Sequence, residues 1–365
     1  MKLKIGIIGT RGIPNAYGGF EQFAETLAAA LVGKGHEVSV YNSSLHPFKE
    51  MHWRGVNIIV CKDREDKYGT AGQFIYDLNC IKDSQKRNFD VLLHLGYTSD
   101  SIWHSRWPKN CLNIVNMDGL EWKRQKYSWL TKVFLRKAES WAANYADVLI
   151  ADSKPIQDYL QQKYNKQSTY IPYPAEIFKN PDEPVLKKFS LQPYQYYLIV
   201  ARMEPENNIE VIIRAVLASG QELVYIIGET KNKYGRYLKK KYSGNQVVFI
   251  GGIYDKQTLN NLRFYSKIYF HGHSVGGTNP SLLEAMACGC RIVAHDNIFN
   301  REVLGTDADY FSNSEDLKEI ISSEKNKTDL DRQVKNNLSK IETFYSPEQI
   351  IDGYEKLLVS SLNRR

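Results

Sequence analysis

Residues 267–296 read KIYFHGHSVGGTNPSLLEAMACGCRIVAHD, and this stretch decides the fold class. It begins with the apolar run KIYFHG, passes through a glycine-rich loop into the helix-forming segment PSLLEAMACG, and ends in a second apolar run, RIVAHD. A strand, a helix and another strand with short connections form the unit from which parallel sheets are built. Both runs are apolar without alternation, which is typical of strands buried on both faces. The stretch therefore predicts a parallel sheet covered by helices on both sides.

The helix in this stretch has clear signals at both ends. Asn279 is a suitable N-cap, and Pro280 is favoured at the first helical position. Gly289 is suited to end the helix at its C-terminus. We therefore expect the helix to begin at residue 280, directly after the glycine-rich loop.

The glycine-rich loop itself predicts a phosphate site. Gly276, Gly277 and Thr278 run into the helix N-terminus, where backbone N–H groups and the helix dipole favour an anion. Glu284 lies about one turn into the helix, where its carboxylate either accepts hydrogen bonds from ribose hydroxyls or is simply solvated. His273 borders the loop and either contacts the same ligand or makes local hydrogen bonds.

The same alternation of apolar runs and helical patterns extends over the whole chain. The first half contains the runs LKIGIIG, HEVSVY, NIIVC, FDVLLHL, LNIVNM and DVLIADS, and the second half contains YYLIVA, ELVYIIG and VVFIG. Residues 172–194 hold five prolines and suit a linker. We predict two doubly wound Rossmann-like domains, 1–175 and 176–345, facing each other across a cleft, with a C-terminal helix at 346–365 that packs on the first domain. Ligands of such sheets bind at the carboxyl ends of the strands.

Composition excludes several classes of protein. The chain has 365 residues, 42% hydrophobic and 24% charged, which argues against disorder. No apolar run approaches the roughly 20 residues that span a bilayer, and we expect no signal peptide. The five cysteines have no zinc-like spacing and fit a reducing compartment. We expect a cytoplasmic protein, associated at most with the inner face of a cell membrane.

The net charge of +7 is concentrated in the first half of the chain. Residues 1–175 carry 23 basic and 17 acidic side chains, and residues 101–150 combine eight basic groups with four acidic ones. Aromatic residues beside cations favour an anionic membrane surface, although an amphipathic helix with a solvated basic face has the same pattern. Nucleic acid is disfavoured because no reading motif is present. The expected membrane or acceptor surface comprises Trp122, Lys123, Arg124, Lys126 and Trp129.

Two further loops carry candidate binding groups. Gly18 and Gly19 lead directly into a helix, which allows a ligand to approach the backbone. The glycines before them are spaced Gly6-x-x-Gly9-x-x-Gly12, which is not the dinucleotide fingerprint. Arg202 closes the strand YYLIVA, where it either faces a diphosphate or forms a surface ion pair.

These three loops, in this order, resemble those of the retaining glycosyltransferases of family 4, which have the GT-B fold. The resemblance extends through GHEVSVY, ADVLIADSKPIQDYL, IPYP and the closing FYSPEQIIDGYEKLL. The forms GTRGIP-x-x-YGGFE, DGLEWKR, RMEPENN and HSVGGTNPSLLEAMA look more narrowly like bacterial rhamnosyltransferases of polysaccharide assembly. The resemblance implies that the first domain binds the acceptor and the second a nucleotide sugar. The donor-binding residues that it implies, together with the loop histidine, are Gly18, Gly19, Arg202, Asn207, His273, Gly276, Gly277, Thr278, Asn279 and Glu284.

Three positions depart from the family pattern. Asn207 stands where the family has a lysine beside the diphosphate, and Gly276 stands where it has the first of two glutamates. Asp118, in NMDGLEW, replaces a histidine of the first domain. The resemblance implies that all three positions lie around the donor sugar, which favours a 6-deoxy sugar such as L-rhamnose. The expected donor is dTDP-L-rhamnose, with a UDP-sugar or a GDP-sugar as alternatives, and the expected acceptor is a lipid-linked saccharide.

The implied chemistry needs no metal and no cofactor. Negative charge develops on the leaving diphosphate, where Arg202 and a helix N-terminus supply stabilisation. Asp118 follows a strand and either accepts the acceptor proton or positions the donor, with Glu121 as a second catalytic candidate. Two other functions stay open: a nucleotide-dependent epimerase or dehydrogenase, and a non-catalytic nucleotide-sugar binding subunit.

Overall fold

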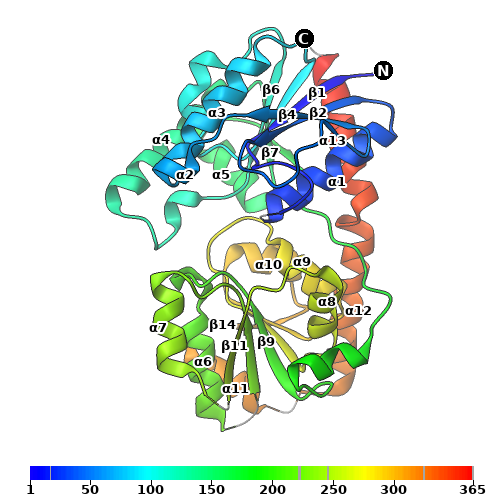
Figure 1. Cartoon of the computed structure of the whole chain (residues 1–365). Coiled ribbons are helices and arrows are strands. Elements are labelled where there is room, and N and C mark those ends of the chain that lie inside the picture. Colours follow the sequence, from blue (N-terminus) through cyan, green and yellow to red (C-terminus); the bar gives the residue numbers. More distant parts are fainter. Residues whose placement is uncertain (17, 221–222, 245, 324, 364–365) are drawn as a thin grey trace. The chain divides into compact units, whose positions relative to one another are not determined.

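The computed structural model describes residues 1–16, 18–220, 223–244, 246–323 and 325–363. The chain divides into two compact units. Unit 1 contains residues 1–122, 128–173 and 348–365, and unit 2 contains residues 123–127 and 174–347. Each unit is built around its own parallel sheet (Figure 1).

Within the described residues, the strands of unit 1 form one eight-stranded sheet in the order β3-β4-β2-β1-β5-β6-β7-β8. All neighbouring strands are parallel except β3 and β4, which are antiparallel. The central strands are buried throughout, which explains their continuous apolar sequences. The bounds are β1 Lys4–Ile8, β2 Glu37–Ser43, β3 His52–Trp53, β4 Val56–Cys61, β5 Val91–Leu95, β6 Leu112–Met117, β7 Val148–Ala151 and β8 Thr169–Tyr170.

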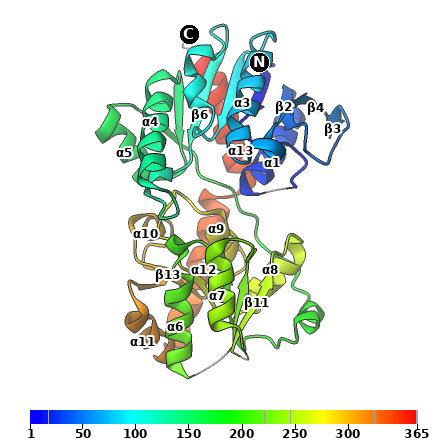
Figure 2. The same ribbon diagram turned by 60° about the vertical axis from the view of Figure 1, so that its left-hand side comes forward.

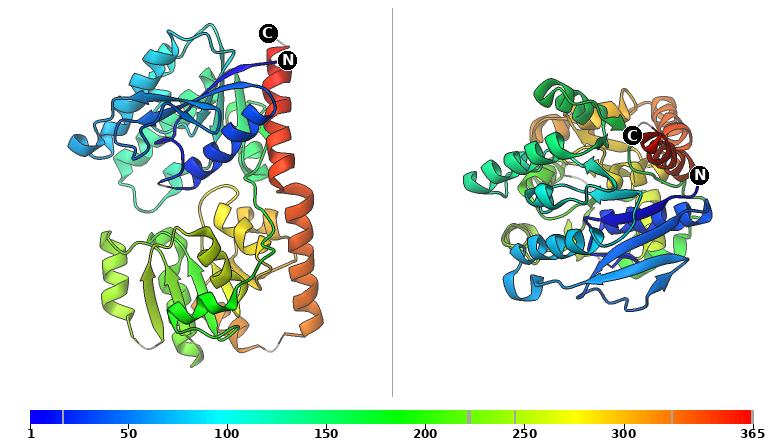
Figure 3. Two further views of the ribbon diagram at one scale, coloured as in Figure 1. Left: turned by 45° about the vertical axis from the view of Figure 1, so that its right-hand side comes forward. Right: turned by 90° about the horizontal axis from the view of Figure 1, so that it is seen from above.

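Helices cover both faces of this sheet, and the last helix returns to it (Figures 1 and 3). From Glu348 onward, α13 belongs to unit 1, where Glu355 pairs with Lys34 at 2.9 Å and Tyr354 packs against Phe23. The α-helices are α1 Gly19–Gly33, α2 Glu65–Tyr68, α3 Ala71–Ser84, α4 Trp129–Tyr145, α5 Lys154–Tyr164 and α13 Pro347–Leu362, and the short 3-10 helices are η1 Ser101–Arg106 and η2 Glu121–Lys123.

Within the described residues, unit 2 has a six-stranded parallel sheet in the order β11-β10-β9-β12-β13-β14. The chain moves outward from β9 through β10 to β11, and then returns to the other side of β9 with β12. The order therefore reverses between β9 and β12, which are hydrogen-bonded neighbours. The bounds are β9 Tyr196–Val200, β10 Leu223–Ile227, β11 Val247–Gly251, β12 Ile268–His271, β13 Ile292–His295 and β14 Asp309–Phe311.

Helices also lie on both faces of the second sheet (Figure 2). Helix α6 packs with α11, and α9 packs with α12 and α8. A buried apolar cluster that includes Ile199, Ile212 and Phe270 joins α6 to the sheet. The helices are η3 Glu183–Phe189, η4 Pro205–Asn207, α6 Ile209–Ser219, α7 Lys233–Tyr242, α8 Lys256–Phe264, α9 Pro280–Ala287, α10 Ile298–Leu304, α11 Ser314–Ser322 and α12 Lys327–Phe344.

The predicted fold class of two doubly wound parallel-sheet domains is confirmed. Every strand predicted from an apolar run is present, although residue 222 of ELVYIIG lies outside the described residues. The sequence interpretation missed β3, β8 and β14, which have two, two and three residues. The proline-rich stretch 172–194 contains η3 and is otherwise without helix or strand. Among the described residues, no helix is both long and apolar enough to cross a membrane.

Candidate functional site

The candidate site of unit 2 lies at the edge of the sheet where the strand order reverses between β9 and β12. Doubly wound sheets bind ligands at the carboxyl ends of the strands beside such a reversal. Two loops emerge there: residues 201–208 after β9 and residues 272–279 after β12. Both loops carry residues that the sequence singled out, so the sheet brings the Arg202 motif and the glycine-rich motif together.

The two loops are tied to each other by hydrogen bonds and close packing. Ser274 donates to the Glu206 carbonyl from both its backbone N (3.0 Å) and its hydroxyl (2.8 Å). The Asn208 side-chain amide donates to the Gly272 carbonyl at 2.8 Å. A Cβ atom at Gly272 would lie 2.1 Å from the Asn207 carbonyl oxygen, so only glycine fits this approach. These contacts therefore hold the loops 201–208 and 272–279 in a fixed arrangement.

Arg202 and Asn207 have different environments in this structure. The Arg202 side chain is exposed, and the described residues show no hydrogen bond or ion pair of its guanidinium. The Asn207 side chain is buried, and its amide donates to the Arg202 carbonyl at 2.8 Å. Asn207 thus braces the loop that presents Arg202, while Arg202 is available for an anion.

The helix after the second loop begins as the sequence predicted. Helix α9 starts at Pro280, and the Asn279 side chain accepts a hydrogen bond from the Ser281 N–H at 2.9 Å. Thr278 is buried, whereas Gly276 and Gly277 are partly exposed. Gly276 has φ +143°, and a Cβ built there meets no atom within 4 Å. The space beside Gly276 is therefore open, on a backbone that favours glycine.

Glu284 is held by a residue that the sequence interpretation missed. The Arg263 guanidinium, 1% exposed, pairs with the Glu284 carboxylate at 2.5 Å and donates to Asn260 at 3.0 Å. Burial alone would lower the pKa of Arg263, but the attraction of Glu284 keeps that pKa above its ordinary value. Arg263 is buried in α8 together with Asn260, Asn261 and Leu262, so no local pattern of the sequence marked it.

Three histidines line the carboxyl ends of β12 and β13. The His271 and His273 rings stack with centroids 4.4 Å apart, and neither ring nitrogen of His271 has a hydrogen-bond partner among the described residues. Burial, followed by the nearby charges of Arg202 and Arg124, lowers the pKa of His273 to about 3. Burial also lowers the pKa of His295. The lowered pKa values keep these rings neutral at neutral pH, so they add no positive charge to this edge.

In unit 1, the loop after β1 leads into α1 through Gly18 and Gly19. Gly18 is the N-cap of α1, and its N–H donates to the Asn15 side chain at 3.2 Å. The loop bends at Gly9, where φ is +87° and a Cβ would lie 2.4 Å from the Leu95 carbonyl oxygen. The strand order of unit 1 reverses between β1 and β5, so the paired glycines lie at the corresponding edge of this sheet.

Asp118 lies at the same edge of unit 1, directly after β6. Its Oδ1 atom is 3.9 Å from the Cβ position of Gly96, which follows β5. The Tyr97 hydroxyl donates to the Gly119 carbonyl at 2.8 Å and fixes the loop that follows Asp118. Burial, and then the charge of Asp118, raise the pKa of Tyr97. Glu121 lies three residues further on, at the start of η2 and partly exposed.

The five residues expected at a membrane are distributed over different environments. The Trp122 indole N–H donates to the buried Glu139 carboxylate at 2.9 Å, and the Arg136 guanidinium covers its ring at 4.4 Å. Trp129 is instead 73% exposed at the first residue of α4, and Leu130 next to it is 71% exposed. Trp122 is therefore part of the fold of unit 1, and Trp129 is on its surface.

Lys123, Arg124 and Lys126 lie in the segment that belongs to unit 2. The Lys126 ammonium is 3.3 Å from a Glu204 carboxylate oxygen. Arg124 Nη1 is 3.8 Å from a carboxylate oxygen of Glu206, whose side chain is fully buried. Both glutamates belong to the loop that begins at Arg202. Two of these three basic residues therefore lie at the Arg202 loop.

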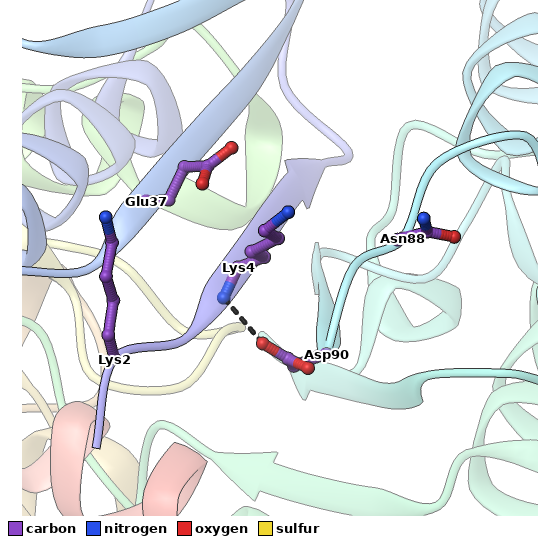
Figure 4. Close-up of a pocket in the computed structure, with 5 residues that line it drawn as sticks. All are labelled: Lys2, Lys4, Glu37, Asn88 and Asp90. Carbon is purple, nitrogen blue, oxygen red and sulfur yellow. Dashed lines mark hydrogen bonds between the residues drawn. The ribbon is translucent and has the colours of Figure 1, made fainter.

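An open depression lined by Lys2, Lys4, Glu37, Asn88 and Asp90 lies at the amino ends of β1 and β2 (Figure 4). The Lys4 backbone N–H donates to Asp90 there at 2.7 Å. This depression is at the edge of the sheet opposite the carboxyl ends. No group of three or more histidine, cysteine, aspartate or glutamate residues in the described ranges is arranged to hold a metal ion.

The two halves of the chain match two different families. Residues 2–176 match a domain of unknown function (DUF1972). Residues 185–340 match the glycosyl transferases group 1. No curated protein sequence matches the chain.

Solved structures share the architecture over nearly the whole length. Sucrose-phosphate synthase from Thermosynechococcus elongatus is similar with a TM-score of 0.82 at 16% identity, covering 100% of both chains. Anabaena HepE in complex with UDP and glucose has a TM-score of 0.78 at 16% identity, covering 98% of this chain and 100% of the other. WaaG, a glycosyltransferase involved in lipopolysaccharide biosynthesis, has a TM-score of 0.68 at 13% identity over 96% and 99%. The fold is therefore GT-B, and the match of residues 185–340 supports a transferase.

Proposed function

We propose that this protein is a metal-independent, retaining glycosyltransferase of family 4 that transfers a sugar from a nucleoside diphosphate to a lipid-linked saccharide. The observation that carries the proposal is the edge between β9 and β12, where the exposed Arg202 and the N-terminus of α9 follow neighbouring strands. A guanidinium and a helix N-terminus are two standard ways to hold phosphate. Anabaena HepE, which is similar in fold, has been crystallised with UDP-glucose.

The same groups would stabilise the reaction. When the bond from the anomeric carbon to the diphosphate breaks, negative charge develops on the leaving oxygen. Arg202 and the positive end of the α9 dipole oppose that charge without a divalent cation. Glu284, held by Arg263, would accept hydrogen bonds from the nucleotide ribose. Gly277, Thr278 and Asn279 would supply backbone N–H groups at the phosphates.

Unit 1 would supply the acceptor side. Asp118 follows β6 at the carboxyl edge of its sheet, where it would accept the proton of the acceptor hydroxyl. Glu121 is the second candidate for this role. Gly18 and Gly19, at the start of α1, are further candidates for binding the donor. Activity that survives Asp118→Asn and is lost in Glu121→Gln would transfer the base role to Glu121.

The donor sugar that we propose is L-rhamnose, carried by dTDP. The open space beside Gly276 offers no side chain to hydrogen-bond a sugar hydroxyl, and Asn207 already donates to the Arg202 carbonyl. A 6-deoxy sugar lacks one hydroxyl of an ordinary hexose and needs fewer polar contacts. UDP-sugars and GDP-sugars are the competing donors.

An anionic membrane would hold the acceptor, and α4 offers the surface for it. Trp129 and Leu130 are 73% and 71% exposed, and Val133, one turn later, is 45% exposed. Lys132, Arg136 and Lys137 lie on the same helix. An apolar patch with flanking cations binds the interface of an anionic bilayer. We therefore place the membrane contact at the start of α4 rather than at Trp122.

Incubation of the pure protein with a panel of nucleotide sugars and lipid-linked acceptors tests the function. We expect transfer from dTDP-L-rhamnose with retention at the anomeric carbon, read out by NMR of the product. Transfer from another nucleotide sugar would correct the donor alone. Nucleotide binding without transfer to any acceptor would favour a non-catalytic binding subunit.

Flotation with vesicles containing phosphatidylglycerol tests the membrane surface. The double variant Trp129→Ser/Leu130→Ser should lose vesicle binding, while the control Tyr254→Ser, on a residue 77% exposed in unit 2, should keep it. Equal flotation of both variants would remove the membrane contact from α4.

A further inference from the structure

Five residues of the basic stretch, Lys123–Tyr127, belong to unit 2 although the residues on either side belong to unit 1. Within unit 2 they meet the Arg202 loop through two ion pairs. Lys126 lies 3.3 Å from Glu204, and Arg124 lies 3.8 Å from Glu206. Arg124 and Lys126 are thus placed beside the Arg202 loop by acidic groups of the loop itself.

The buried carboxylate of Glu206 holds Arg124 at the Arg202 loop. Its side chain is fully buried, and neither carboxylate oxygen has a hydrogen-bond partner among the described residues. A buried carboxylate requires a nearby cation, and Arg124, with its side chain 15% exposed, is the cation paired with it. Ser274, in the loop after β12, also donates to the Glu206 carbonyl, so Glu206 links the two loops. Arg124 is therefore anchored at the edge between β9 and β12.

His273 lies close enough to Arg202 and Arg124 for both of their charges to affect its pKa. The charges of Arg202 and Arg124 both contribute to lowering the pKa of His273, after the larger effect of burial. The His273 ring stacks on His271 and precedes Gly276 by three residues. Arg202 and Arg124 therefore both act on the loop that leads into α9.

We propose that Arg124 is a second cation for the donor diphosphate and a catalytic residue for its departure. A guanidinium carries five N–H donors in a planar fork, so Arg124 can hold Glu206 and a phosphate oxygen at the same time. Asn207 braces the loop through the Arg202 carbonyl and supplies no charge. Arg124 supplies this second positive charge from a different segment of the chain.

The step to which Arg124 contributes is the transfer itself, so the inference rests on the proposed function. The bond from the anomeric carbon to the diphosphate oxygen breaks, and its electron pair stays on that oxygen. The acceptor oxygen forms the new bond to the carbon, and its proton passes to Asp118. The diphosphate gains one negative charge, which Arg202 and Arg124 oppose from the side of unit 2.

Titration calorimetry of the full chain with UDP, dTDP and the corresponding monophosphates tests the inference. Arg124→Ala should weaken the binding of the diphosphate that wild type prefers by at least tenfold, and Arg124→Lys should weaken it less. The effect on the monophosphate should be several times smaller because it lacks the β-phosphate. The surface arginine control Arg332→Ala, 53% exposed in unit 2, should bind as wild type does.

Because Arg124→Ala leaves Glu206 buried without its cation, the double variant Arg124→Ala/Glu206→Gln removes both charges and serves as the folded reference. Its weaker diphosphate binding, with unchanged vesicle flotation, would support the proposal. Diphosphate binding equal to that of wild type in this double variant would overturn it, as would a loss confined to vesicle flotation. A wild-type protein that binds neither nucleotide would instead overturn the proposed function, and the role of Arg124 with it.

Discussion

Glu284 should have a structural role that can be separated from its role in ribose binding. Its carboxylate is 25% exposed and pairs at 2.5 Å with Arg263, which is 1% exposed. At that distance the Coulomb attraction is about 7 kcal/mol for an effective dielectric constant of 20, before the cost of desolvation. Glu284→Gln keeps the size of the side chain but leaves the buried guanidinium without its counter-charge. The expected loss of unfolding free energy is about 3 kcal/mol, the lower end for a broken buried pair because Glu284 is partly solvated.

Thermal denaturation followed by circular dichroism measures this loss. For a unit of this size, about 3 kcal/mol corresponds to a Tm that is lower by about 6–12 °C. The double variant Arg263→Met/Glu284→Gln removes both charges and should regain most of the lost stability. The exposed pair Arg301–Asp296 offers a control, and Arg301→Met should leave the Tm almost unchanged.

Nucleotide binding by the same proteins separates the two roles. If Glu284 also holds the ribose, the double variant will regain stability without regaining nucleotide affinity. A Glu284→Gln protein as stable as wild type would show that the Arg263 charge is compensated elsewhere and that the Glu284 pair does not stabilise unit 2. Full nucleotide affinity in the double variant would remove the ribose role.

Three further predictions concern the same edge of unit 2. Gly272→Ala should destabilise unit 2 strongly, because its Cβ would lie 2.1 Å from a carbonyl oxygen, whereas Gly244→Ala, with no atom within 4 Å, should be tolerated in the same thermal assay. Asn279→Ala should cost about 1 kcal/mol in urea denaturation and also weaken diphosphate binding, because the cap orients the start of α9. His273 has a folded pKa of about 3, below its ordinary value near 6.5, so only the unfolded chain gains this proton between those values. Stability should therefore fall as pH falls from about 6.5 toward 3, and His273→Gln should reduce that slope by up to about 1.4 kcal/mol per pH unit.

The architecture was accessible from the sequence because parallel strands buried on both faces leave continuous apolar runs. Strands β1 and β9, of five residues each, have this signature. Strands β3 and β14, with two and three residues, are too short to form any pattern. Helix α7 reads KYGRYLKKKY and buries little besides Leu238. Its sequence has no apolar pattern at helical spacing, so it was not predicted.

The site was predictable where local sequence marks the backbone. Asn279 and Pro280 predict the start of α9. Arg202 directly follows an apolar run, which places it near the end of a strand. The pairing of Arg263 with Glu284 spans 21 positions of sequence, and that of Arg124 with Glu206 spans 82, so neither has a local signal. Such contacts depend on how the chain folds back on itself.

The sequence also did not distinguish the different environments of Trp122 and Trp129. Both are aromatic residues beside cations, and the sequence assigned both to one surface. The indole N–H of Trp122 is bound by Glu139, a buried carboxylate that also accepts from the Tyr159 hydroxyl, whereas Trp129 is exposed. A basic and aromatic composition therefore did not distinguish a tryptophan packed in the fold from one on the surface, and only tertiary contacts do so.

The central claim is that the edge between β9 and β12 holds a nucleoside diphosphate through Arg202. Titration calorimetry of UDP and dTDP into wild-type protein and Arg202→Ala, in buffer containing EDTA, tests it most directly. We expect wild type to bind at least one of the two without a divalent cation, and Arg202→Ala to bind it at least tenfold more weakly, about 1.4 kcal/mol. Wild-type protein that binds neither nucleotide, or an Arg202→Ala protein that binds as wild type does, would contradict it.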